Sequence, residues 1–178
     1  GGDVQVIDGF KRLRAARVLG WSEVRAHALD VDLVGAKFAI AFLHERCGLT
    51  ELEEAWLVRS LYRDDRLSQP EIGVRLSRHK SWVSRRLVMA EGLDEAVQAD
   101  VRLGLLAPRA AVELTQLPRG NQLPAAQVVT RTGMTVRQTA QLVSELLVCG
   151  SDAARACLLR ERLEHPGPRG TPRPARRA

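Results

Sequence analysis

The stretch 67–87, which reads LSQPEIGVRLSRHKSWVSRRL, constrains the fold more than any other part of the sequence. Ile72 and a leucine one turn later form an apolar pair, and Gly73 supplies the small residue that two crossing helices need where they touch. Val83 and Leu87 are four residues apart and therefore share one face of a second helix. This spacing predicts a helix-turn-helix, in which two short helices cross steeply at a short turn.

The same stretch is basic, because no acidic residue occurs from Leu76 to Ala90. Arg and Lys side chains pair with guanine edges or phosphates, and Ser contacts either. The candidate DNA-binding residues are Arg75, Arg78, His79, Lys80, Ser81, Ser84, Arg85 and Arg86. A solvated helical hairpin without a nucleic-acid partner is the alternative. Trp82 could pack against the preceding helix or lie along a sugar-phosphate edge, and we favour packing.

Helical spacing continues from residue 34 onward, so we expect a mainly α fold. Capping-box patterns at Thr50 and Ser68 mark two helix starts. The expected further helices cover 34–46, 94–103, 108–117, 124–132 and 135–147, with a loop at 118–122 and a short helix after 150.

The N-terminal residues have a different pattern, typical of a strand, a helix and a second strand at 4–7, 10–19 and 21–29. We therefore expect a small α/β remnant at 1–33, with residues missing upstream, before an all-helical helix-turn-helix domain at 34–148. Residues 149–178 are expected to form a basic, largely disordered tail, since 165–178 hold four prolines and four arginines.

Composition excludes several classes of protein. Apolar residues make up 45% of the 178, which argues against wholesale disorder. No apolar run approaches the roughly 18–20 residues of a membrane-spanning helix, and no signal peptide opens the chain. Cys47, Cys149 and Cys157 are an odd number without a CxxC motif, which excludes a disulfide framework or a four-cysteine zinc site. We expect a cytoplasmic protein without a membrane partner.

Metal and catalytic motifs are weak. His44 and Cys47 are three residues apart, but a structural zinc site needs four ligands, so we expect no metal there. The Asp64-Asp65 pair has no further carboxylate or histidine near it in sequence, which favours a solvated turn over a metal-dependent nuclease. No arrangement of nucleophile and base has a supporting motif, and we name no catalytic residue.

Several segments, in order and at the right spacing, together resemble the ParB family of partition proteins. IDGFKRLRAARVLG at 7–20 is similar to that family's GERRxRA motif, and LTELEEA at 49–55 to the start of its DNA-binding domain. Residues 93–118 and 134–143 resemble the helices that complete this domain. The resemblance covers about 4–147.

The resemblance implies sequence-specific binding of a short palindromic DNA site by paired helix-turn-helix modules, in plasmid or chromosome segregation. It also implies self-association on DNA, association with the nucleoid or a plasmid, and a ParA-type ATPase as a candidate partner. A transcriptional regulator of a plasmid or mobile element that uses the same module is an open alternative.

Many family members also bind CTP with magnesium and slide on DNA as a clamp. The residues that match phosphate-binding positions are Gly9, Lys11, Arg12, Arg14 and Arg46. Phe10, Phe42 and Leu43 stand where the family has acidic or amide side chains, and apolar side chains cannot hold magnesium. We therefore expect that no cofactor is required, that CTP binding is weak or absent, and that the chain is not an enzyme. A CTP-gated clamp with CTPase activity is the alternative.

Overall fold

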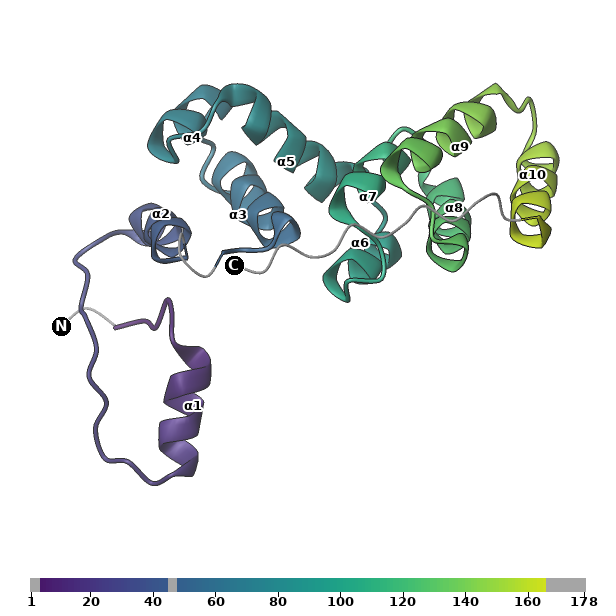
Figure 1. The fold of residues 1–178 in the computed structure, drawn as a ribbon. Coiled ribbons are helices and arrows are strands. Elements are labelled where there is room, and N and C mark those ends of the chain that lie inside the picture. The colour runs from purple at the N-terminus through teal and green to yellow at the C-terminus, as the bar shows by residue number, and fades with distance from the viewer. Residues whose placement is uncertain (1–3, 45–47, 166–178) are drawn as a thin grey trace.

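The computed structural model describes residues 4–44 and 48–165, which form ten helices and no strand (Figure 1). The helices are α1 Phe10–Val18, α2 Leu33–Leu43, α3 Glu51–Arg63, α4 Gln69–Arg75, α5 Lys80–Gly92, α6 Glu95–Arg102, α7 Pro108–Leu114, α8 Arg119–Thr132, α9 Val136–Val148 and α10 Asp152–Glu164. In Figure 1, α2, α3 and α4 lie at one end, α8, α9 and α10 lie at the other, and α5 leads from the first group toward α6 and α7. The expected mainly α fold is confirmed.

The helix-turn-helix is held by a small core of its own. Its buried side chains come from α2, α3, α4 and α5, and are Phe38, Val58, Leu61, Ile72, Val83 and Leu87. Both predicted capping boxes are present: Thr50 with Glu53 begins α3, and Ser68 with Glu71 begins α4. The apolar spacing in the sequence and the caps therefore act together to fix where these helices start and which faces they bury.

A second core connects α5 to the helices that follow it, and one buried polar side chain lies at the junction. Gln122 is 1% exposed, and its Nε2 donates to the carbonyl oxygens of Gly92 and Leu117 at 2.9 and 3.0 Å. Its Oε1 accepts the backbone N–H of Asp94 at 2.8 Å. These three bonds satisfy backbone groups at the ends of α5 and α7 and the start of α6.

The expected loop at 118–122 is wrong, because α8 begins at Arg119 and contains Pro124 as an internal residue. The Asn121 N–H donates to the Pro118 carbonyl at 2.9 Å and closes the first turn. Pro124 removes one helical N–H, but the carbonyl that would have accepted its hydrogen bond belongs to Gly120, which is exposed to solvent.

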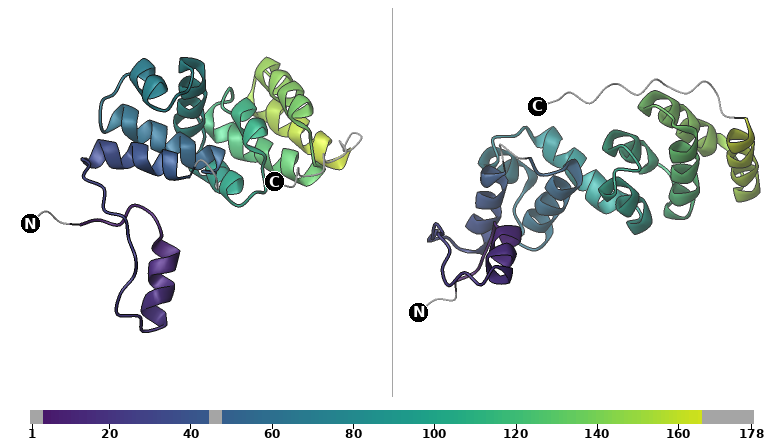
Figure 2. Two further views of the ribbon diagram at one scale, coloured as in Figure 1. Left: turned by 60° about the vertical axis from the view of Figure 1, so that its left-hand side comes forward. Right: turned by 60° about the horizontal axis from the view of Figure 1, so that its bottom comes forward.

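The α/β remnant expected at the N-terminus is not found among the described residues. Helix α1 forms close to its predicted position, but 4–7 and 21–29 contain no strand. A strand needs a neighbouring strand for its backbone N–H and C=O groups. Residues 21–33 are all exposed and lie along no such neighbour. In Figure 1 and in the left view of Figure 2, α1 stands apart below α2.

The C-terminal region is more ordered than the sequence suggests. Helix α10 has 13 residues and packs against α8, with Leu159 only 8% exposed. Arg155 donates to the carbonyl oxygens of Leu146 and Cys149 at 3.2 Å each, which ties α10 to the end of α9. The tail expected at 149–178 therefore includes a packed helix, while 166–178 lie outside the described residues.

Candidate nucleic-acid interface

The turn between α4 and α5 is short and closed by backbone hydrogen bonds. The Arg78 N–H donates to the Gly73 carbonyl at 2.8 Å, and the Ser77 N–H donates to the Val74 carbonyl at 3.1 Å. Ser77 adopts a left-handed conformation with φ 54°, which reverses the chain within few residues. Gly73 is buried against this turn, as the spacing predicts.

The start of α5 is capped by one of the candidate DNA-binding residues. His79 is the N-cap, and its Nδ1 accepts the Ser81 backbone N–H at 3.2 Å. The Ser81 hydroxyl lies 2.8 Å from the same nitrogen. Since Nδ1 is used as an acceptor, the neutral ring carries its proton on Nε2, which leaves a donor at the outer edge of an exposed side chain.

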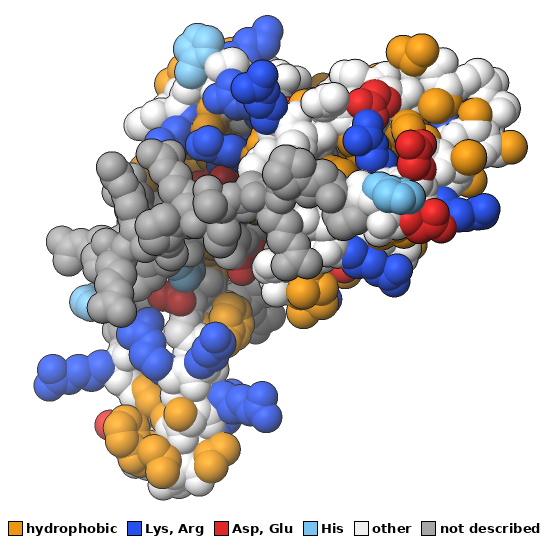
Figure 3. Space-filling view, turned by 45° about the vertical axis from the view of Figure 1, so that its right-hand side comes forward, with side chains coloured by type: hydrophobic (Ala, Val, Ile, Leu, Met, Phe, Trp, Pro, Cys, Tyr) orange, Lys and Arg blue, Asp and Glu red, His pale blue; other side chains and the backbone are white. Residues whose placement is uncertain are grey.

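The face of α5 that points away from both cores carries Ser81, Ser84, Arg85 and Val88, which share one side of the helix at helical spacing. Ser81, Arg85 and Val88 are exposed, and Lys80 is exposed in the first turn. The side chains of Lys80 and Arg85 make no hydrogen bond or ion pair with any described residue. In Figure 3, Lys and Arg side chains gather at the upper end of the molecule, over α4 and α5. The charges of Lys80 and Arg85 are therefore available to an anion from outside the chain.

Arg86 lies on a different side of α5 from this face. Its side chain is 13% exposed and bonds to carboxylate oxygens of Glu51 at 3.0 Å and Glu54 at 2.7 Å. These two acids belong to α3, so Arg86 braces α5 against α3. The structure does not bring it together with Lys80 and Arg85.

Two other candidates are held by aromatic rings. The guanidinium of Arg75 lies 5.4 Å from the ring centre of Phe38, and that of Arg78 lies 5.5 Å from the ring centre of Trp82. Trp82 is half-buried and packs against the helix-turn-helix core, which is the role that we favoured. Both arginines remain exposed and lie beside the turn rather than on the outward face of α5.

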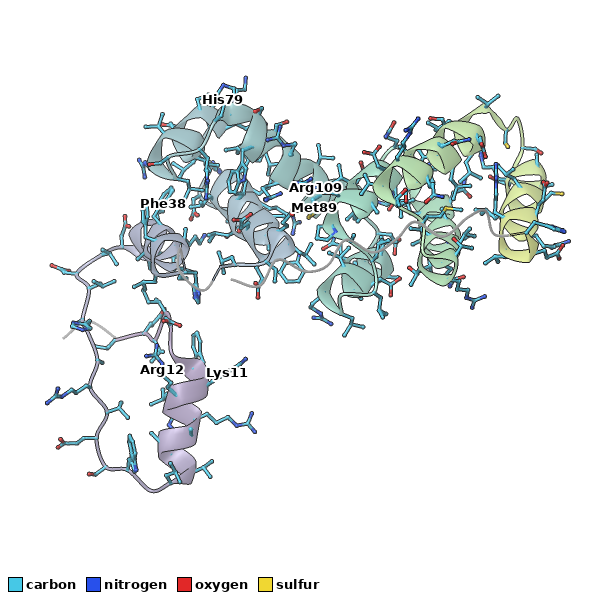
Figure 4. The ribbon with its side chains drawn as sticks, in the orientation of Figure 1. Lys11, Arg12, Phe38, His79, Met89 and Arg109 are labelled. Atoms are coloured by element: carbon cyan, nitrogen blue, oxygen red, sulfur yellow. The ribbon has the colours of Figure 1, made fainter. Side chains whose placement is uncertain are left out.

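The candidate phosphate-binding residues are only partly brought together. Gly9 has φ 82° and precedes α1, and the Arg12 Nη2 lies 3.3 Å from the Asp8 carboxylate. Figure 4 shows Lys11 and Arg12 on different sides of α1. Arg14 is exposed on the same helix, and Arg46 lies outside the described residues.

The apolar residues of α2 that replace the family's acidic and amide side chains cannot bind a metal ion. Phe42 and Leu43 are 48% and 53% exposed, and their side chains offer no oxygen to magnesium. His44 Nε2 lies 3.8 Å from the Asp8 carboxylate, while its suggested partner Cys47 is outside the described residues.

The acidic pair after α3 has structural partners. Asp65 forms an ion pair of 2.5 Å with Lys37, and Asp64 accepts the Ser60 hydroxyl at 2.8 Å. Among residues 4–44 and 48–165, no group of three His, Cys, Asp or Glu side chains could hold a metal ion. The prediction of a solvated turn is wrong for Asp65, because its side chain is only 10% exposed and its ion pair with Lys37 holds α2 to the loop before α4.

One basic residue near the interface was not singled out from the sequence. Arg109 is exposed in the first turn of α7, and α7 packs against α5 (Figure 4). The Arg109 side chain makes no hydrogen bond or ion pair with any described residue. It lies 24 residues beyond Arg85 in the sequence, so only the packing of α7 against α5 relates it to the motif.

A buried glycine contact, a closed turn and an unpaired basic face on the second helix define a protein of the helix-turn-helix class. The family model described as the ParB HTH domain matches residues 48–148, and the chain belongs to this family. The resemblance stated from the sequence is confirmed.

Curated relatives agree with this assignment. The chain is 31% identical over 161 residues to the chromosome-partitioning protein ParB of Myxococcus xanthus, covering 88% of this chain and 53% of the relative. It is 26% identical over 150 residues to a nucleoid occlusion protein of Geobacillus thermodenitrificans, covering 84% of this chain and 53% of the relative. The chain thus spans about half the length of these relatives.

A solved structure has the same fold. A C-terminally truncated chromosome-partitioning protein ParB from Caulobacter crescentus, complexed to the centromeric parS site, matches with a TM-score of 0.56 and 23% identity. The match covers 79% of this chain and 74% of that chain. None of the helices in the described part of our chain is long and apolar enough to cross a membrane.

Proposed function

We propose that the chain binds duplex DNA sequence-specifically, with α5 in the major groove. The observation that carries the proposal is the outward face of α5, where Lys80 and Arg85 are exposed and unpaired within the described chain. Lysine and arginine in the first turns of a recognition helix reach guanine O6 and N7, and serine reaches either bases or phosphates. Ser81 and Ser84 complete this base-reading face.

The other candidates are assigned to the DNA backbone or to the fold. Arg75, Arg78 and His79 lie beside the turn, so they contact phosphates that flank the groove. Arg109, in the first turn of the neighbouring helix α7, adds a further phosphate contact. Arg86 acts as the brace between α5 and α3, and its effect on DNA binding is indirect.

The biological role that we propose is partition of a chromosome or plasmid. The relative from Myxococcus xanthus is a chromosome-partitioning protein, and the solved relative from Caulobacter crescentus is complexed to a centromeric site. Two copies of this chain would assemble on a palindromic site, because half-site spacing reflects two-fold symmetry. A ParA-type ATPase is the proposed further partner, and the nucleoid or a plasmid in the cytoplasm is the proposed location.

DNA recognition in this proposal requires no nucleotide. Arg12 is paired with Asp8, and Phe42 and Leu43 offer no magnesium ligand. Isothermal titration calorimetry with CTP and magnesium, beside a phosphate-release assay with DNA, tests this point. Micromolar CTP binding with DNA-stimulated turnover would favour a nucleotide-gated clamp instead.

Selection of binding sites from a random duplex library tests the proposed function. The expected result is enrichment of one inverted repeat whose half-sites are recognised by two copies of the chain. No enrichment over the starting library, with binding that is equal for all sequences, would contradict sequence-specific recognition. The same selection with Lys80→Ala should lose preference at one position of each half-site.

A further inference from the structure

Trp82 lies between two arginines that have different surroundings. The ring centre is 5.1 Å from the Arg86 guanidinium and 5.5 Å from that of Arg78. Arg78, Trp82 and Arg86 follow at intervals of four residues, so they form one stripe that extends from α5 into the preceding turn. Arg86 is fixed at one end of this stripe by Glu51 and Glu54.

The Trp82 ring is held by packing against the core, whereas the Arg78 guanidinium has only this ring as a partner among the described residues. Trp82 packs against the helix-turn-helix core, whereas the Arg78 side chain is exposed and makes no hydrogen bond or ion pair with a described residue. The contact with the ring is therefore what limits the conformations of the Arg78 side chain. A cation over an indole face is attracted by the ring quadrupole, most strongly for tryptophan among the aromatic side chains.

The stripe also determines where Arg78 points. Trp82 and Arg86 lie on the side of α5 that faces α3, since Arg86 binds two acids of α3. Ser81 and Arg85 each lie about 100° around the helix from their neighbours on the stripe. Arg78, held against Trp82, is thus directed along the flank of α5 and away from the base-reading face.

We propose that Trp82 is a positioning residue that holds Arg78 ready for a DNA phosphate beside the groove. This inference rests on the proposed function, because it concerns how one contact to the same DNA is prepared. An arginine already confined on the ring loses less side-chain entropy when it binds the phosphate. Removing the ring leaves Arg78 in place but makes its contact weaker.

The test is a double-mutant cycle in which the affinity for DNA and its dependence on salt are measured. Arg78→Ala should weaken binding to all DNA sequences alike and reduce the slope of log K against log salt concentration by about 1. Trp82→Leu should weaken binding by about 2- to 5-fold when Arg78 is present. In the Arg78→Ala background, Trp82→Leu should have no further effect. Trp82→Phe keeps an aromatic face and should restore part of the loss.

A matched control separates positioning from packing. Leu67 is half-buried against the same core and does not line the pocket that Arg78 and Trp82 share, so Leu67→Ala also weakens the fold without touching Arg78. Its effect on DNA affinity should be the same with and without Arg78. If the effect of Trp82→Leu also persists in the Arg78→Ala background, Trp82 acts only through packing and the inference is overturned.

Fluorination provides a second measurement if Trp82→Leu does not fold. In a chain with Trp21→Phe and Trp56→Phe, fluorinated tryptophans at position 82 weaken the ring quadrupole with little change in shape. DNA affinity should fall stepwise with the number of fluorines, and only while Arg78 is present. A constant affinity would overturn the inference. Arg85→Ala, measured in parallel, reports on the proposed function itself, because it should lower sequence preference whatever Trp82 does.

Discussion

Gly73 and Arg78 touch through their backbones across the turn between α4 and α5. The Arg78 N–H donates to the Gly73 carbonyl, and a Cβ added at Gly73 would lie 2.7 Å from the Arg78 carbonyl oxygen. Such a distance is shorter than a van der Waals contact, and the atom that would have to move belongs to the backbone. The close approach of α4 to the start of α5 therefore requires glycine, and it sets the angle at which α5 is presented.

We expect Gly73→Ala to destabilise the protein by about 1–3 kcal/mol, because the turn must shift away from the new methyl group. The same shift should weaken DNA binding by moving the start of α5. Urea unfolding measures the first effect. Gly120→Ala is the control, since a Cβ there meets nothing within 4 Å and alanine favours a helix. Equal stability of the two variants would contradict the contact.

The buried amide of Gln122 makes a second prediction. Gln122→Leu fills a similar volume but leaves the Asp94 N–H and the Gly92 and Leu117 carbonyls without their partner. We expect a loss of about 2 kcal/mol or more in the free energy of unfolding. Gln127→Leu on the exposed side of α8 should stay within about 0.5 kcal/mol of the parent. If Gln122→Leu leaves the free energy of unfolding unchanged, other groups have replaced the three hydrogen bonds.

The packed position of α10 gives a third prediction. Leu159→Ala removes a side chain buried against α8 and should cost about 2 kcal/mol. Leu163, on the same helix and 36% exposed, provides the control, and Leu163→Ala should cost much less. If both variants unfold at the same urea concentration as the parent, α10 does not contribute to the fold.

Stability should fall in acid below pH 4.5. The Arg63 guanidinium donates to both oxygens of Glu91, at 2.6 and 2.8 Å, and holds the pKa of Glu91 below its usual value of 4.5. The Ser68 hydroxyl and backbone N–H likewise lower the pKa of Glu71, and the Thr50 backbone N–H and hydroxyl lower the pKa of Glu53.

A carboxylate whose pKa is lowered in the folded state stabilises the protein at pH values above its unfolded-state pKa. This stability is lost as the pH falls through the folded-state pKa. The urea midpoint should therefore drop from about pH 4.5 downward. Glu91→Gln removes one of the three groups and should flatten the drop. A midpoint that stays constant down to pH 3 would contradict these ion pairs and caps.

The sequence predicted best those features that depend on neighbours in the chain. The caps at Thr50 and Ser68 and the glycine contact at Gly73 follow from spacings of a few residues, and all three are present. The role of Arg86 could not be predicted, because its partners Glu51 and Glu54 are more than 30 residues away in sequence.

Tertiary context also explains the errors. The apolar residues at 4–7 and 21–29 have strand propensity, but a strand forms only where another strand satisfies its backbone. Pro124 suggested a helix start, yet the burial of Gln122, Ala125 and Ala126 extends α8 toward its N-terminus. Arg109 could be related to the motif only through the packing of α7 against α5.

The most direct test of DNA recognition is the affinity of the Lys80→Ala/Arg85→Ala double variant for the selected palindrome and for a scrambled duplex. Arg102→Ala/Arg160→Ala is the control, because it removes two exposed positive charges outside the helix-turn-helix. We predict that the Lys80/Arg85 variant loses at least about 25-fold in affinity for the palindrome, equivalent to about 2 kcal/mol, and no longer prefers it to the scrambled duplex. The control variant should keep that preference. If the Lys80/Arg85 variant binds and discriminates the two duplexes as the parent does, α5 is not the recognition helix.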